Sequence, residues 1–329
     1  MKSARAACLG GALLALPGCS GAQSALEVTG REAADIYFLF IVATALSVVV
    51  TLLVLILLVI VLWGPQRWRA RLGSDRVVIG GGIVLPVVLL SLLLGYGLFV
   101  LDAGASRVAR AEDGVITIVG KRWWWEVAYT TADGDRVVSA NELRLPVGRP
   151  VALRLESDNV IHSFWAPQLA GKLDMIPGRT NTLVVEATEP GVSRGQCAEY
   201  CGGAHALMSF FIIAMPPGEY DAWLRKEAAP ARAPEAAIAQ RGHDLFLENG
   251  CGACHTVRGT RAGGTIGPDL THVGSRRSLA AATLPNDAEA FARWIKDNQH
   301  IKPENLMPAY ENLEPDELAA IAAYLEGLD

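Results

Sequence analysis

The sequence has little net charge and few cysteines or histidines, and each shortage narrows the classes of protein to which the chain can belong. Among 329 residues, 29 Lys and Arg stand against 34 Asp and Glu, which leaves a net charge of -5. This balance lacks the basic excess of a nucleic-acid-binding protein, so no nucleic-acid partner is expected. A hydrophobic content of 51% excludes a disordered chain. The six cysteines do not form a disulfide framework, because two lie near the N-terminus and four lie in two short motifs.

The N-terminal segment, residues 1–18, has the pattern of a secretory signal peptide. Lys2 and Arg5 precede an apolar stretch that ends in small residues before Cys19. The segment Leu-Pro-Gly-Cys at 16–19 resembles a bacterial lipoprotein box, which predicts that Cys19 is the lipidated mature N-terminus. The alternative is an ordinary cleaved signal or an uncleaved leader in which Cys19 is an unmodified thiol. Residues 19–35 are expected to form an extracytoplasmic segment.

Two apolar runs, 36–63 and 77–101, exceed the roughly 20 residues that span a bilayer. The segment between them carries four arginines against one aspartate, which places it in the cytoplasm. We therefore expect a two-helix transmembrane hairpin over residues 36–104. The chain is then a multi-pass protein of a bacterial cell membrane, and its globular domains lie on the outer or periplasmic side.

Residues 105–227 change to short β-type runs separated by Gly, Pro and Asp. The β-branched stretches lie at 115–119, 136–138, 150–155, 182–186 and 210–215. Short strands at such spacing predict a β-sandwich or barrel. Residues 228–236 are rich in Ala and Pro and are typical of a semi-rigid linker. Residues 237–329 form a last domain, with helical patterns at 236–248, 288–298 and 315–325.

The first cysteine motif combines soft sulfur ligands with histidine: Cys197, Cys201, His205 and Met208, with the distant His162 upstream. Two thiolates four residues apart on one loop can both bridge a pair of copper ions, while each histidine caps one metal. The methionine and the backbone carbonyl of Glu199 complete the set as weak ligands. A disulfide or a zinc site is the alternative, but a disulfide leaves the histidines and the methionine without a role.

The second motif, Cys251-Gly-Ala-Cys254-His255, is the signature of covalent haem c attachment. The two thiols add to the haem vinyl groups, and His255 is placed to bind the iron from one side. Met307, which precedes a proline, is the only methionine after this motif and is the expected second iron ligand. The carbonyl of Pro268 is the expected hydrogen-bond acceptor for His255. The competing iron ligands are His243, His272 and His300, each better explained as a surface or packing residue.

Residues 37–224 resemble subunit II of the haem-copper cytochrome c oxidases. The resemblance rests on the copper motif and on the segments 121–125, 158–163 and 172–179. It implies a cupredoxin-like sandwich that holds the dinuclear copper centre CuA. It also implies that Trp123 receives the electrons, and that the Glu199 side chain faces a magnesium site shared with subunit I.

Residues 237–329 resemble an all-α class I cytochrome c domain. The whole chain is therefore similar to the caa-type oxidases, in which subunit II carries a fused cytochrome c. The implied chain is a multidomain membrane protein that belongs to the enzyme cytochrome c oxidase. It passes electrons from a soluble or membrane-bound donor through haem c and CuA to subunit I, with subunit III as a further partner.

Neither apolar run contains a histidine, so the oxygen-reducing centre must lie in the partner subunit I. The full set of copper ligands argues against a quinol oxidase subunit, and the membrane hairpin argues against a nitrous oxide reductase. Two alternatives stay open from the sequence. One is the CuA-containing subunit of a nitric oxide reductase-like complex, and the other is a non-catalytic copper-binding lipoprotein.

Overall fold

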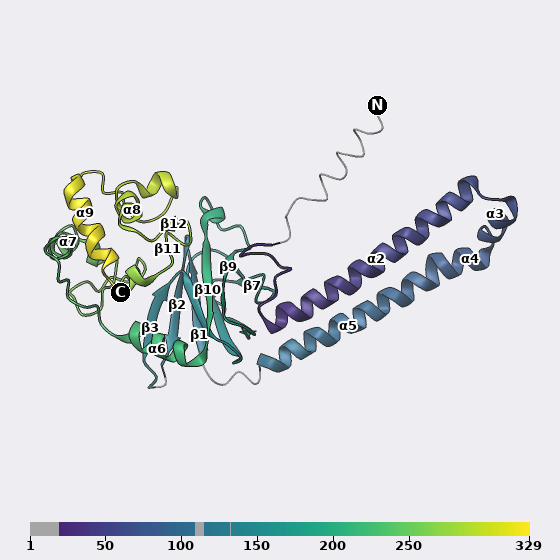
Figure 1. Ribbon diagram of the computed structural model, residues 1–329, viewed down its shortest axis with the longest axis horizontal. Coiled ribbons are helices and arrows are strands. Elements are labelled where there is room, and N and C mark those ends of the chain that lie inside the picture. Colours follow the sequence, from purple (N-terminus) through teal and green to yellow (C-terminus); the bar gives the residue numbers. More distant parts are fainter. Residues whose placement is uncertain (1–19, 109–114, 132) are drawn as a thin grey trace, which may run out of the picture.

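The computed structural model describes residues 20–108, 115–131 and 133–329, so Cys19 and the predicted signal peptide lie outside the described residues. Three parts follow one another along the long axis of the molecule in Figure 1: a helical hairpin, a β-sandwich and a small helical domain. The sandwich lies in the middle. The helical domain therefore contacts the sandwich on the side away from the hairpin.

The hairpin pairs α2 (Arg31–Trp63) with a second long helix, which consists of α4 (Asp75–Ile79), the π-helical turn η1 (Gly80–Val84) and α5 (Leu85–Val108). Both are long and apolar enough to cross a membrane, and no residue in their most apolar stretches is buried against the protein. A helix that is apolar on every side and unburied is suited to lipid. The hairpin of Figure 1 thus agrees with the predicted membrane segment.

The helices extend beyond the apolar runs from which they were predicted. The first helix begins at Arg31 rather than at residue 36, because its first turn is held on the sandwich. The Arg31 guanidinium donates to both carboxylate oxygens of Glu186, at 2.8 and 2.9 Å, and Ala33 is buried. The expected loop at 64–76 contains the short helix α3 (Gln66–Leu72). Hydropathy marks only the length that lipid surrounds, and the helical hydrogen bonds continue past it.

The sandwich contains ten strands: β1 (Val115–Lys121), β2 (Trp124–Thr130), β3 (Arg136–Ala140), β4 (Glu142–Pro146), β5 (Val151–Ser157), β6 (His162–Trp165), β7 (Lys172–Met175), β8 (Asn181–Val185), β9 (Gly191–Cys197) and β10 (Ser209–Met215). They form two five-stranded sheets with the orders β3-β2-β1-β5-β8 and β4-β10-β9-β6-β7. Alternate residues of β1 are buried, as expected for a strand with one face on the core. The aromatic rings of Trp125, Tyr129 and Phe164 lie fully buried between the sheets.

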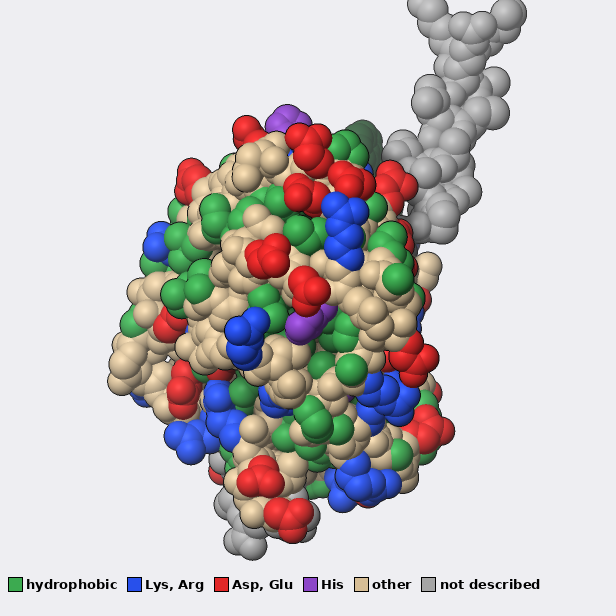
Figure 2. Space-filling model, turned by 90° about the vertical axis from the view of Figure 1, so that its left-hand side faces the viewer, with side chains coloured by type: hydrophobic (Ala, Val, Ile, Leu, Met, Phe, Trp, Pro, Cys, Tyr) green, Lys and Arg blue, Asp and Glu red, His purple; other side chains and the backbone are tan. Residues whose placement is uncertain are grey.

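The helical domain begins after α6 (Pro217–Ala228) and a short extended connection. Its helices are α7 (Ala237–Glu248), α8 (Ala288–Ile301) and α9 (Pro315–Glu326), joined by a small hairpin of β11 (Ser278–Leu279) and β12 (Leu284–Pro285). A capping box formed by Glu314 and Glu317 starts α9. All three helices lie where their sequence patterns predicted them. Figure 2 shows the outer side of this domain, where acidic side chains gather toward the top.

Candidate copper and haem centres

The candidate copper ligands come from two neighbouring strands and one loop of the sandwich. His162 is the first residue of β6, and Cys197 is the last residue of β9. These strands are antiparallel neighbours, with Phe164 opposite Cys197, so the sheet holds the histidine against the start of the loop. The loop then carries Cys201 and the short helix η2 (His205–Leu207) before it enters β10.

The ligand atoms of His162, Cys197 and Cys201 all lie within 4.8 Å of one another, and those of His205 and Met208 lie beside Cys201. The Nδ1 atom of His162 lies 3.8 Å from the sulfur of Cys197, and the Nδ1 atom of His205 lies 3.5 Å from the sulfur of Cys201. The Met208 sulfur lies 3.8 Å from the Cys201 sulfur. Each histidine therefore faces a different cysteine, which is the arrangement that two metal ions with bridging thiolates require.

The separation of the two thiols favours a metal site over a disulfide. The sulfurs of Cys197 and Cys201 lie 3.8 Å apart and both cysteines are free, whereas a disulfide bond is about 2.05 Å long. Thiolates at this separation could both hold metal ions. The backbone carbonyl of Glu199 lies 3.1 Å from the Cys197 sulfur. The donor set and its spacing suit a sulfur-bridged pair of copper ions.

The two thiols have opposite pKa shifts. Hydrogen bonding with Cys201 and His162 holds the pKa of Cys197 well below its usual value. The contact with Cys197, together with burial, raises the pKa of Cys201. A metal ion that binds both sulfurs must displace any proton that they carry.

Residues that the sequence analysis did not single out orient His162. Its Nε2 atom lies 3.2 Å from the side-chain oxygen of Asn159, which leaves Nδ1 free to bind metal. Gly120 on β1 faces the same ring from the opposite sheet. A Cβ atom at Gly120 would lie 2.7 Å from Cδ2 of His162. Gly120 has no local signal in the sequence, because its contact joins strands of the two different sheets, whereas Asn159 lies only three residues before His162.

Trp123 is buried next to the copper loop. Its indole nitrogen donates to the carbonyl oxygen of Cys201 at 3.0 Å, and only 3% of the residue is exposed. Gly202, the residue after Cys201, has a φ of +113°, and a Cβ atom at this residue would lie 2.9 Å from the Trp123 ring. The loop therefore needs glycine at 202, both for the left-handed backbone and for the close approach of the indole.

The predicted haem ligands line one large cleft in the helical domain. Cys251, Cys254, His255 and Met307 all lie on the walls of this cleft. The Nδ1 atom of His255 lies 2.8 Å from the carbonyl oxygen of Pro268, the acceptor expected from the sequence. Burial lowers the pKa of His255, which keeps the imidazole neutral for binding iron.

The polar atoms of the cleft also suit a haem. The Nε atom of Arg276 and the hydroxyl of Ser278 are buried without a hydrogen-bond partner, and both residues line the cleft. Buried polar atoms of this kind require an acceptor or donor, which the propionate groups of a haem provide. The cleft is otherwise lined mainly by apolar side chains, as a haem macrocycle requires.

The competing histidines do not line this cleft. The two ring nitrogens of His272 lie 2.8 Å from the carbonyl oxygen of Asp329 and 3.0 Å from that of Ala229. The ring of His243 packs against Tyr324, and His300 is exposed. All three are thus packing or surface residues in this structure.

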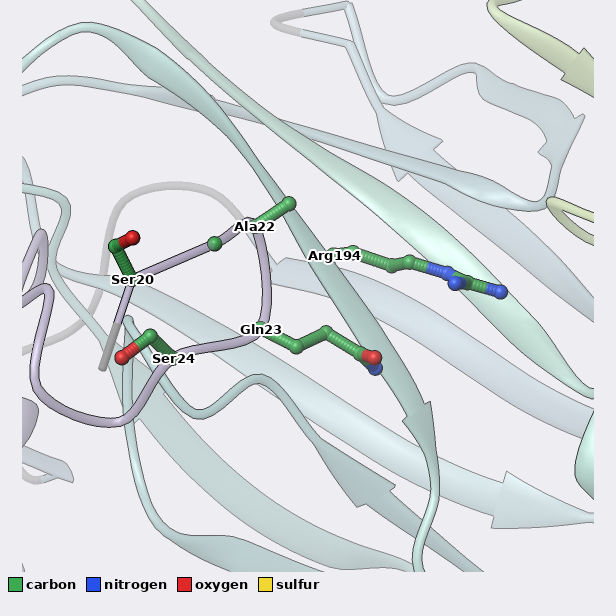
Figure 3. Close-up of a pocket in the computed structure, with 6 residues that line it drawn as sticks. Ser20, Ala22, Gln23, Ser24 and Arg194 are labelled. Carbon is green, nitrogen blue, oxygen red and sulfur yellow. The ribbon is translucent and has the colours of Figure 1, made fainter. Parts of the chain in front are cut away.

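A separate pocket lies where the N-terminal segment crosses the sandwich. Figure 3 shows Ser20, Ala22, Gln23 and Ser24 around it, with Arg194 of β9 beneath. The backbone nitrogen of Arg194 donates to the carbonyl of Ala22 at 2.8 Å, which ties the segment to the sheet. None of the predicted ligands lines this pocket, so it is not part of either candidate centre.

The chain is similar to known proteins over nearly its whole length. The family described as cytochrome C oxidase subunit II, periplasmic domain, matches residues 133–215, and the cytochrome c family matches residues 239–329. The cytochrome c oxidase subunit 2 of Alkalihalophilus pseudofirmus is 35% identical over 330 residues, which cover 96% of this chain and 94% of the relative. That of Bacillus subtilis is 31% identical over 343 residues, with the same two coverages.

Among solved structures, the periplasmic domain of subunit II of the Bradyrhizobium japonicum cytochrome oxidase is 30% identical. It covers 35% of this chain and 93% of its own length, with a TM-score of 0.33.

Proposed function

Because this chain belongs to the cytochrome c oxidase subunit II family and carries a fused cytochrome c domain, we propose that its two metal centres work in series through Trp123. The chain is an electron-transfer subunit of a membrane oxidase, with a copper centre in the extracytoplasmic sandwich and a haem in the C-terminal domain. In the proposed order, the chain takes electrons from an external donor into the haem domain. It then passes them through the sandwich to the oxygen-reducing subunit I.

The proposed copper ligands are His162, Cys197, Cys201, His205, Met208 and the carbonyl of Glu199. Their support is the short distance between neighbouring sulfur and nitrogen atoms of these side chains, which is 3.5 to 3.8 Å for each pair. The proposed haem attachment uses Cys251 and Cys254, with His255 and Met307 as iron ligands, supported by their place on one cleft. A dinuclear copper and a haem supply one-electron redox chemistry at these places.

The observation that carries the proposed order is that Trp123 belongs to both places. Its indole nitrogen donates to the carbonyl of Cys201, and Trp123 lines the haem cleft together with Arg122 and Trp124 of the sandwich. A single residue thus adjoins both the copper loop and the haem cleft. The chain itself needs no large motion to bring the two centres into contact.

The test replaces Trp123 by alanine in the complete oxidase. Trp123→Ala should leave the haem and copper absorption intact but slow the oxidation of the haem by oxygen in rapid-mixing spectroscopy. Trp124→Ala is the matched control, because Trp124 lines the cleft but its neighbour Trp123 makes the bond to Cys201. Haem oxidation at the unmodified rate in Trp123→Ala would rule out the proposed route.

Three finer assignments follow from the family. The exposed side chain of Glu199 is proposed to face a magnesium ion at the contact with subunit I, and subunit III is proposed as a further partner. Both globular domains are proposed to lie outside the cytoplasm. Loss of bound magnesium from the purified complex on Glu199→Gln, with copper retained, would support this role, whereas retained magnesium would exclude it.

The two alternative functions are less well supported. A subunit of a nitric oxide reductase-like complex or a copper-binding lipoprotein would account for the copper loop alone. The similarity to the cytochrome c oxidase subunits of the two relatives extends over 96% of this chain. It therefore includes the hairpin, the sandwich and the haem domain together.

A further inference from the structure

Lys302 of the haem domain is buried at the contact with the sandwich. Lysine is almost never fully buried unless its charge is paired or hydrogen-bonded, yet only 3% of Lys302 is exposed. Its ammonium donates to the carbonyl oxygens of Trp123 at 2.6 Å, Leu207 at 3.0 Å and Ala280 at 3.2 Å. Three donors therefore meet three acceptors, and two of these acceptors belong to the sandwich.

The two acceptors in the sandwich adjoin the proposed copper site. Trp123 is the residue whose indole bonds to Cys201, and Leu207 directly precedes Met208 in the copper loop. The hydroxyl of Thr283 also donates to the carbonyl of Leu207, at 3.4 Å. The haem domain thus binds backbone carbonyl groups beside the copper site. Changing a side chain of the copper loop would leave these acceptors in place.

A strained turn of the haem domain completes this contact. Ala280, Ala281 and Ala282 have φ values of +52°, +61° and +60°, a left-handed conformation that costs each L-residue of order 1–3 kcal/mol. Each of their carbonyls accepts a hydrogen bond at the contact. Ala280 accepts from Lys302, Ala281 from the backbone nitrogen of Ser209 at 3.3 Å, and Ala282 from Arg194 at 3.3 Å. The carbonyls of Ala281 and Ala282 accept from the sandwich itself, and that of Ala280 accepts from the lysine that bridges the contact, so the contact accounts for the strain.

We propose that Lys302 is a positioning residue that locks the haem domain onto the copper loop, so that Trp123 is reached only through the haem domain. This proposal rests on the proposed function of Trp123. A flexible tether alone would hold the two domains at millimolar effective concentration and let them separate. The lock instead gives one fixed contact, which covers Trp123 and denies an external donor direct access to the copper domain.

Lys302→Met in the complete, metal-loaded oxidase tests this lock. Methionine keeps an unbranched side chain of similar length but removes all three donors. Losing the two buried hydrogen bonds to the sandwich should lower the equilibrium constant for docking by about tenfold or more. Lys296→Met is the matched control, because Lys296 is exposed and lies on α8, which ends directly before Lys302.

Two measurements report the outcome. The backbone amide of Ser209, which donates across the contact to Ala281, should exchange with deuterium at least tenfold faster in Lys302→Met than in Lys296→Met. Haem-to-copper electron transfer should slow, and an added soluble reductant should reduce copper without first reducing the haem. If the amide keeps its protection, or if copper is still reduced only after the haem, the lock is wrong.

The haem and copper absorption spectra show whether the variant still holds both metals. If Lys302→Met loses haem or copper absorption, Lys302→Gln, which keeps an amide donor, takes its place, and the same two readouts apply. The Ser209 amide reports the lock and does not depend on the electron route. Failure of the lock is therefore seen in amide exchange, whereas failure of the proposed route is seen in the unchanged rate of Trp123→Ala.

Discussion

Replacing Gly120 by alanine should displace His162 and weaken the copper site while the sandwich stays folded. A Cβ atom at residue 120 would lie 2.7, 2.9 and 3.1 Å from Cδ2, Cγ and Cβ of His162. Ordinary contact begins near 3.4 Å, so the ring or the strand must retreat by about 0.7 Å, beyond the roughly 0.5 Å that a metal site tolerates. Overpacking of this size costs about 1–3 kcal/mol of unfolding free energy. Copper affinity should fall by about 10–100-fold, as for other residues that orient a ligand.

The matched control is Gly191→Ala. Gly191 also lies on a strand of the sandwich, but a Cβ atom there would have no neighbour within 4 Å. Copper affinity is measured by competition with a chelator, and unfolding by denaturant titration of the full chain. The haem absorption should be the same in both variants, because the haem domain is untouched. Equal copper affinity in the Gly120 and Gly191 variants would refute the argument that Gly120 sets the position of His162.

Two further predictions concern the metal ligands. Met307→Ala should lower the haem reduction potential by on the order of 100 mV, because a thioether ligand raises this potential. The copper centre should still assemble. A redox titration that gives the unmodified haem potential would show that Met307 is not an iron ligand. Copper binding to the metal-free chain should release about one proton, because the raised pKa of Cys201 keeps its thiol protonated. Copper affinity should therefore rise about tenfold per pH unit around neutral pH, and a flat pH profile in chelator competition would contradict the paired thiol and thiolate.

The sequence alone was sufficient wherever the information is local. The haem motif lies in five consecutive residues, and five of the six proposed copper ligands lie within the twelve residues 197–208. The apolar runs and the three helices of the haem domain follow from periodicity and composition over one segment each. Such local patterns were enough to predict the β-sandwich and to reveal the similarity to the oxidase subunits. They were not enough to predict the exact helix ends, because the docking of Arg31 on Glu186 extends α2 beyond its apolar run.

Only the tertiary structure decided which residues serve the two centres from a distance. The sequence named His162 as a ligand, but its place beside Cys197, 35 residues away, results from the pairing of β6 and β9. Gly120 lies against His162 because the two sheets face each other. Lys302 reaches the carbonyl of Trp123 across 179 residues. A buried lysine, a glycine in a strand and three left-handed alanines have no local pattern that marks them. Their roles arise from contacts between segments far apart in the sequence, which local periodicity does not encode.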